Sequence, residues 1–114
     1  MPINYVDTSE DFRRIILSGR LDTADAEEIS TRFAALAASG KRRVVVDLTE
    51  VTFLASMGIR AIIANAKAQQ SRGGRLVLAM GANESVAKTL ESTGVDVLIP
   101  TFKDAAEAEK AVLA

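Results

Sequence analysis

The segment between Val44 and Ala66 changes its hydrophobic period once, and this change limits the fold more than any other feature of the chain. Val44 to Leu48 is a short apolar run rich in β-branched residues, which is typical of a strand covered on both faces. After a short loop, apolar residues recur at the spacing of one helix face: Ile59, Ile62, Ile63 and Ala66. The segment therefore predicts a buried strand, a loop and an amphipathic helix over residues 58–71.

The same alternation of apolar runs and helical stripes predicts the remaining elements. Strands over residues 3–6 and 12–18, joined by a polar turn, indicate an antiparallel hairpin that Gly19 ends. The elements expected besides these are a helix from Asp22 or Thr23 to Ser39-Gly40, a strand over 75–80, a helix over 83–93, a strand over 95–99, and a last helix that Asp104 and Glu107 start. Because strands separated by helices form parallel crossovers, we expect an α/β fold: a single mixed, mainly parallel β-sheet with crossover helices and an antiparallel N-terminal strand.

Length, charge and composition narrow the class of protein. A chain of 114 residues predicts one domain over residues 1–114, and 48% hydrophobic with 25% charged residues is typical of a soluble globular protein. The net charge of -1 and the 4% aromatic content give no reason to expect a nucleic-acid partner. No apolar run approaches the roughly 20 residues that span a membrane, and the N-terminus lacks a signal-peptide profile. We therefore expect a cytoplasmic protein without a membrane span.

The chain contains neither histidine nor cysteine, and this excludes several kinds of chemistry. No Ser-His-Asp triad, histidine base or thiolate metal site can be built from this chain alone. Gly73-Gly74 lacks the spacing of a phosphate-binding loop and is interpreted as a turn, and the basic run Lys41-Arg42-Arg43 as the solvated start of a strand. We expect a protein that is not an enzyme and that uses no cofactor and no metal.

Ser56 stands immediately before the helical stripe, where a hydroxyl group has two roles open to it. It can cap the exposed backbone N–H groups of the helix, since serine is a preferred N-cap residue. It can also carry a phosphate, which would meet the positive end of the helix dipole. Beside it, Gly58 indicates close packing or an unusual backbone angle, and Met57 is either core filler or, as we favour, part of a contact surface.

Four motifs, spread in order over nearly the whole chain, resemble those of STAS domains, the family of bacterial anti-sigma factor antagonists (anti-anti-sigma factors). The segment from Val44 to Gly58 resembles a signature of a hydrophobic strand, an Asp-Leu turn and Phe-x-Asp-Ser-Ser/Thr-Gly before a helix. The other three are Gly19-Arg20-Leu21-Asp22 after a strand, Gly73-Gly74-Arg75-Leu76-Val77-Leu78 at a turn into a strand, and Glu91-Ser92-Thr93-Gly94-Val95 at a helix end. Ala55 stands in the place of the acidic residue, and Met57 in that of the second Ser/Thr.

The resemblance implies partner switching in the regulation of transcription. The unphosphorylated domain would bind an anti-sigma factor, itself a serine kinase, and so release a sigma factor. Phosphorylation of the domain would break this complex, and a phosphatase would restore it. Ser56 matches the phosphoacceptor position of the family. The implied partner-binding residues are Asp22, Ala55, Ser56, Met57, Gly58, Ile59 and Arg60.

Ala55 and Met57 keep a second hypothesis open. STAS-like domains also serve as adaptor or scaffold subunits of transport complexes and sensory assemblies, without a phosphoswitch. The missing acid and the missing hydroxyl beside Ser56 favour this alternative.

Overall fold

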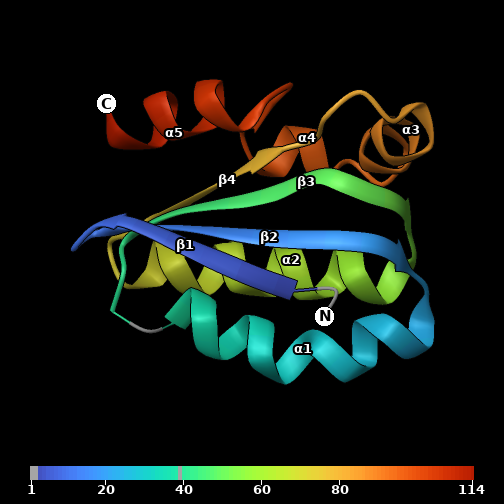
Figure 1. Ribbon diagram of the computed structural model, residues 1–114, viewed down its shortest axis with the longest axis horizontal. Coiled ribbons are helices and arrows are strands. Elements are labelled where there is room, and N and C mark those ends of the chain that lie inside the picture. Colours follow the sequence, from blue (N-terminus) through green and yellow to red (C-terminus); the bar gives the residue numbers. More distant parts are fainter. Residues whose placement is uncertain (1–2, 39) are drawn as a thin grey trace.

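One five-stranded sheet with helices on both faces organises the chain (Figure 1). The computed structural model describes residues 3–38 and 40–114. In chain order the elements are β1 (Ile3–Ser9), β2 (Phe12–Leu21), α1 (Thr23–Ala38), β3 (Arg43–Leu54), α2 (Ser56–Ser71), β4 (Arg75–Ala79), α3 (Glu84–Ser92), α4 (Val95–Leu98), β5 (Thr101–Phe102) and α5 (Ala105–Leu113). The strands lie in the order β1-β2-β3-β4-β5, with β1 antiparallel to β2 and all other neighbours parallel. The predicted α/β fold with a mixed, mainly parallel sheet is confirmed.

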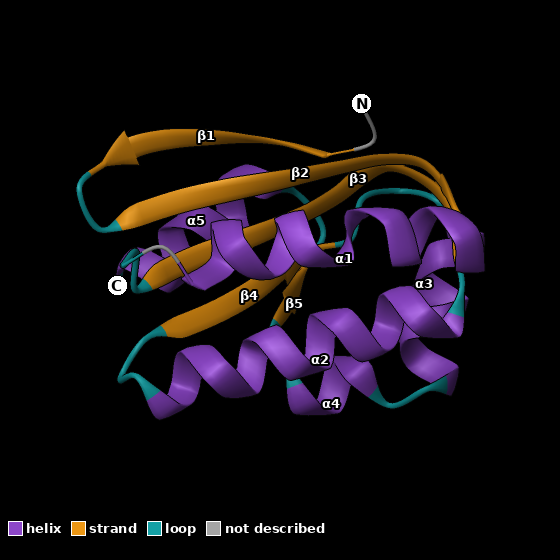
Figure 2. Ribbon diagram, turned by 90° about the horizontal axis from the view of Figure 1, so that it is seen from below, coloured by secondary structure: helices purple, strands orange, loops and turns teal. Residues whose placement is uncertain are grey.

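Helices α1 and α2 cover one face of the sheet, and α5 covers the other (Figures 1 and 2). Val44 and Val46 of β3 belong to the larger apolar core on the side of α1 and α2. Val45 points to the other face, where it packs in a smaller core with Val112 of α5. Burial on both faces explains the continuous apolar run in this strand, because successive side chains of a strand point to opposite faces.

The two long central strands extend further than the sequence predicts. β2 passes through Gly19, which adopts a φ of 79°, and continues to Leu21. β3 continues to Leu54 because its pairing with β2 resumes after shifts in register, up to the pair of Leu21 and Leu54. The loop expected between Leu48 and Ser56 is therefore wrong, and a single residue, Ala55, separates β3 from α2.

The strand expected over residues 95–99 is also wrong. This segment forms the short helix α4, which follows Gly94 in the left-handed conformation with a φ of 76°. Val95 and Ile99 are buried one helical turn apart, and the N–H of Ile99 donates to the carbonyl of Val95 at 2.8 Å. The Val97 side chain is 86% exposed and the Leu98 side chain 64%. The helix thus exposes to solvent two apolar residues that the predicted strand would have buried.

Several turn and cap predictions are confirmed. The Asp104 carboxylate accepts a hydrogen bond of 2.8 Å from the N–H of Glu107 at the start of α5. Gly73, with a φ of 78°, and Gly74 form the turn into β4. A Cβ atom at Gly74 would lie 2.7 Å from the carbonyl oxygen of Arg42, so this turn requires glycine for space as well as for its backbone angle.

The basic run Lys41-Arg42-Arg43 at the start of β3 makes hydrogen bonds to two other parts of the fold. Lys41 Nζ donates to the carbonyl of Glu10 at 2.7 Å, which ties the run to the β1–β2 hairpin. Arg43 Nη1 donates to the carbonyl of Val112 at 2.6 Å, in the last turn of α5. Cations at a helix C-terminus compensate its dipole and its unpaired carbonyl groups. No helix within residues 3–38 and 40–114 is long and apolar enough to cross a membrane.

Candidate functional site

Ser56 lies at the end of the sheet where β2 and β3 both finish. The N–H of Ala55 donates to the carbonyl of Leu21 at 2.9 Å and fixes the short connection between β3 and α2. Ala55, in extended conformation, is the N-cap residue and offers no side-chain cap. Ser56 is exposed and is the first residue of α2, which begins two residues before the predicted start at residue 58. Its predicted role as the N-cap is therefore wrong, and Ala55 takes the cap position.

The first turn of α2 is open to an anion. It contains no acidic residue, and its N-cap side chain is a methyl group that covers none of the free N–H groups. Arg60 is exposed one turn after Ser56, at the i+4 spacing that brings side chains together on a helix. The start of α2 therefore combines the positive end of the helix dipole with an exposed arginine one turn later.

Gly58 and Ile59 support this end of α2 from inside. Gly58 is buried, and a Cβ atom at this position would lie 2.8 Å from Leu54 Cδ1. Its φ is not positive, so close packing explains the glycine and the proposed unusual backbone angle is wrong. Ile59 is only 5% exposed. Both residues hold the Ser56 turn against the core and offer almost no surface to a partner.

The other residues of the predicted partner surface are at least partly accessible. Ala55 and Met57 are half-buried, and Asp22 is half-buried directly after Leu21. Because Leu21 pairs with Leu54 in the parallel ladder, Asp22 and Ala55 are the residues that directly follow two adjacent strands. The structure thus brings Asp22, far away in the sequence, to the same end of the sheet as Ser56.

Arg20 lies near the same end of the sheet, although no motif in the sequence singles it out. It pairs with Phe53 across β2 and β3, and its guanidinium carbon lies 4.2 Å from the centroid of the Phe53 ring. Stacking of this kind holds an arginine over the ring while leaving it open to solvent. The sequence does not reveal this contact, because Gly19 was expected to end β2 before Arg20 and the pairing of Arg20 with Phe53 depends on the register of β2 and β3.

The turn of the β1–β2 hairpin lies at the opposite end of the sheet (Figure 1), and a charged cluster of Asp7, Arg13 and Lys41 lies beside it. Arg13 donates to both carboxylate oxygens of Asp7, from Nε at 2.7 Å and from Nη2 at 2.8 Å. These hydrogen bonds lower the pKa of Asp7 against the opposing effect of burial, with help from the charges of Arg13 and Lys41. The same bonds raise the pKa of Arg13. This cluster joins the hairpin to α1, because Arg13 Nη1 also donates to the carbonyl of Leu36 at 3.1 Å.

The acidic residues near the middle of the sheet serve local structure. Asp47 of β3 is 5% exposed, and its Oδ1 accepts from the N–H of Thr49 at 2.9 Å and from its hydroxyl at 2.6 Å. Its other oxygen lies 3.8 Å from Arg14 Nε. Within the described part of the chain, no group of three or more His, Cys, Asp and Glu residues is placed to hold a metal ion.

The chain resembles proteins of one kind in both sequence and structure. BtrV of Bordetella bronchiseptica, named as a candidate anti-sigma factor antagonist, is 37% identical over 62 residues, which are 54% of this chain and 53% of BtrV. The match thus spans about half the length of this curated relative. An anti-sigma factor antagonist of Mycobacterium paratuberculosis superposes with a TM-score of 0.82 at 22% identity, over 98% of this chain and 95% of that one.

SpoIIAA, an anti-sigma factor antagonist, has the same fold. Its unphosphorylated form superposes with a TM-score of 0.75 at 15% identity, over 96% of this chain and 95% of that one. The phosphorylated form of SpoIIAA from Bacillus gives a TM-score of 0.70 at 14% identity, over 96% and 98%. Residues 5–108, nearly the whole chain, match the family model of the STAS domain. This chain belongs to the STAS domain family.

Proposed function

We propose that this protein is an anti-sigma factor antagonist, which binds an anti-sigma factor of the serine kinase type and so releases a sigma factor for transcription. The observation that carries this proposal is the placement of Ser56: a single exposed hydroxyl on the first turn of α2, at the position of the family signature. The name of BtrV, its relative over half the chain, supports the same function. Such a partner would place the protein in the cytoplasm, and binding rather than catalysis would be its activity.

The switch would be a phosphate on Ser56. A phosphoserine adds about -1.5 to -2 charges, and the free N–H groups of a helix N-terminus tolerate such a charge well. The fold of the domain would therefore persist, while an acidic or apolar partner surface would be repelled. A phosphatase would restore binding by removing the charge. SpoIIAA, whose structure is known in both states, is a protein of this fold that is phosphorylated.

The partner surface would centre on Ser56 and use the side chains that the fold leaves accessible around it: Asp22, Ala55, Met57 and Arg60, together with Arg20. Gly58 and Ile59, which the sequence also suggested as partner-binding residues, would act indirectly by fixing the turn from inside.

A second candidate function keeps the interaction surface but not the switch. Ala55 puts a methyl group where the family signature has an acid, and Met57 puts a half-buried thioether where it has a hydroxyl. A kinase would find fewer polar groups to position Ser56, whereas a constant partner would find a larger apolar contact. On this alternative the domain is an adaptor or scaffold subunit of a transport complex or a sensory assembly.

Calorimetric titration with the serine kinase-type anti-sigma factors of the source organism tests the proposal. We expect one of them to bind the wild type and the Ser56→Ala variant, and to bind phosphorylated protein at least tenfold more weakly. Binding of a transporter subunit that does not respond to phosphorylation of Ser56 would establish the adaptor function instead. Phosphorylated protein made with a purified kinase is the stricter reagent, because a carboxylate in place of Ser56 carries less charge than a phosphate.

A further inference from the structure

The last strand of the sheet, β5, pairs with only part of β4. β5 pairs only with Leu78 and Ala79 of β4, whereas β4 begins at Arg75. The N–H of Leu78 donates to the carbonyl of Pro100 at 2.9 Å, toward β5. Because backbone groups alternate along a strand, the N–H and C=O groups of Leu76 point toward the same edge. No β5 residue lies opposite them in the described ladder.

Pro100 is the physical reason that the pairing stops. The register of β4 and β5 makes residue 100 the next donor, toward the carbonyl of Leu76. Proline has no N–H group and cannot make this bond. The chain instead forms α4 before Pro100, and the backbone groups of Leu76 that point to this edge have no partner in the described β4–β5 ladder.

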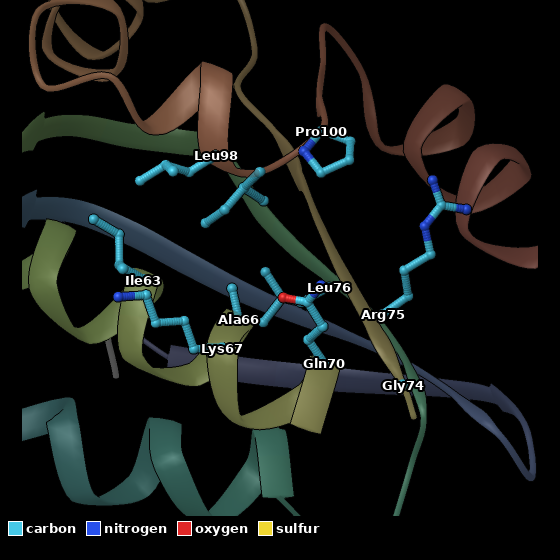
Figure 3. A pocket seen from close by; sticks show the side chains of 10 residues that line it. Ile63, Ala66, Lys67, Gln70, Gly74, Arg75, Leu76, Leu98 and Pro100 are labelled. Atoms are coloured by element: carbon cyan, nitrogen blue, oxygen red, sulfur yellow. The ribbon is translucent and has the colours of Figure 1, made fainter. Parts of the chain in front are cut away.

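A groove with a volume of about 380 Å³ lies along this open edge. Figure 3 shows residues of α2 on one side of it and Leu98 and Pro100 on the other, with Leu76 between them. Ile63, Leu76 and Leu98 give the groove much of its apolar lining, and the Leu98 side chain is 64% exposed. An extended segment could thus find both apolar contacts and backbone partners in one place.

The charged residues that line the groove are both cations, Lys67 and Arg75. The Arg75 side chain extends away from the groove toward α5, where its Nη1 donates to the carbonyl of Ala111 at 3.2 Å (Figure 3). Lys67 is exposed, and no carboxylate of the described residues lies within ion-pair distance of it. A segment with carboxylates therefore complements this edge, and one with lysines or arginines is repelled.

We propose that this groove docks an extended, apolar and acidic segment of a partner protein, which adds to the sheet as a short strand beside Leu76. Apolar side chains of the segment pack between Ile63 and Leu98, and its carboxylates face Lys67. Main-chain hydrogen bonds supply affinity in this mode of recognition, and the pockets for alternate side chains supply specificity. The surface is separate from the Ser56 turn, since Lys67 lies 11 residues further along α2, or roughly 16 Å along its axis.

NMR titration of the 15N-labelled full chain tests the proposal with capped octapeptides of defined sequence. The probe alternates valine with glutamate, and its matched control alternates valine with lysine. We expect the glutamate peptide to shift the amide signals of Leu76, Lys67 and Leu98, to slow hydrogen exchange at the Leu76 amide, and to bind at least fivefold more tightly than the lysine peptide. Absence of these shifts at millimolar peptide, equal affinity of both peptides, or shifts centred on β1, the other edge strand, would each overturn it.

Four variants complete the test. Lys67→Glu should weaken binding of the glutamate peptide at least fivefold, while Lys88→Glu, the same change on the exposed face of α3, should alter it less than twofold. Pro100→Ala supplies the missing N–H group, which can donate to the carbonyl of Leu76 in place of the peptide. This variant should therefore bind the glutamate peptide more weakly. Ser56→Glu should leave peptide binding unchanged, so the outcome is independent of the function proposed above. Unaltered binding in both Lys67→Glu and Pro100→Ala would contradict the docking mode.

Discussion

The N–H of Ala55 donates to the carbonyl of Leu21 at 2.9 Å, and this one bond joins the end of β2 to the turn that presents Ser56. The turn is thereby part of the sheet and not a free loop. Buried Gly58 and Ile59 hold the helical side of the same turn. A rigid support of this kind allows a single charge on Ser56 to change an interface without changing the fold.

A carboxylate at position 56 should weaken partner binding while the fold persists. Ser56 is exposed and lies on the first helical turn, where a negative charge is tolerated. We expect Ser56→Glu to lower affinity for the anti-sigma factor about tenfold, or about 1.4 kcal/mol. Ser56→Gln, which has the same shape without the charge, is the matched control and should bind much more tightly than Ser56→Glu. Calorimetric titration measures the affinity of each variant for the anti-sigma factor, and circular dichroism checks that both variants are folded. Equal affinities of the two variants would rule out a charge effect.

Restoring the family signature should make Ser56 a better kinase substrate. Ala55→Asp supplies the missing acid and Met57→Ser the missing hydroxyl, so the double variant should be phosphorylated faster than the wild type in a phosphotransfer assay with the cognate kinase. Ala64→Ser, which adds a hydroxyl on the exposed side of α2 away from the turn, is a control that should leave the rate unchanged. Rapid and complete phosphorylation of the wild type would show that neither neighbour matters.

Met57 should contribute apolar contact area to the partner complex. Its side chain is half-buried in the free domain, so only part of the roughly 1.5–3 kcal/mol for burial of a methionine remains to be gained on binding. We expect Met57→Ser to weaken binding by about 1 kcal/mol, and Met57→Leu to preserve it. Calorimetric titration of both variants against the same partner measures this difference, and a serine variant that binds as tightly as wild type would show that Met57 lies outside the interface.

The sequence predicts the sheet and most helices well because their signals are local. The apolar run at Val44 and the stripe after Ile59 depend only on period, and Asp104 and Gly73 act within one turn. The predictions are wrong where strand pairing between residues far apart in the sequence determines the structure. Pairing with β2 extends β3 to Leu54, so that Ala55 alone separates β3 from α2. The segment after Gly94 has the apolar pattern of a strand, yet Pro100 lacks the N–H group that would pair with Leu76.

The candidate site could be predicted in part for the same reason. Ser56 and its neighbours in sequence are found from one motif, and the resemblance adds Asp22. The stacked pair of Arg20 and Phe53 depends on a register shift in the β2–β3 ladder, which no local pattern reveals. The groove beside Leu76 depends on the end of β5 and the position of α4 together.

Gln69 should be a stabilising residue despite its polarity. It is completely buried in α2, and its Nε2 donates to the carbonyls of Ala37 and Lys41, each at 2.7 Å. Gln69→Leu keeps the volume but leaves the Lys41 carbonyl without this donor, so we expect a loss of about 1–3 kcal/mol in the free energy of unfolding. Gln70→Leu, at the exposed neighbouring position, should stay within about 0.5 kcal/mol of wild type. Urea unfolding of both variants measures the contrast, and equal stabilities would contradict this role.

The pair of Asp7 and Arg13 should make stability depend on pH in the acid range. The hydrogen bonds from Arg13 lower the pKa of Asp7 below its ordinary value of 3.8. The folded state thus binds the proton less well than the unfolded state, so the contribution of the pair is complete above about pH 4 and is lost as the pH falls through the lowered pKa. At pH 7, Asp7→Asn should cost about 1–3 kcal/mol, since it replaces the carboxylate that accepts two hydrogen bonds from the buried Arg13 with a neutral amide. The difference in the free energy of unfolding between wild type and variant should shrink toward pH 2.

Glu28→Gln is the control, because it makes an equal change of charge on the exposed side of α1; it should show no such difference at pH 7. Urea unfolding at a series of pH values provides the measurement. A difference between wild type and Asp7→Asn that is the same at pH 7 and pH 2 would show that this ion pair does not stabilise the fold.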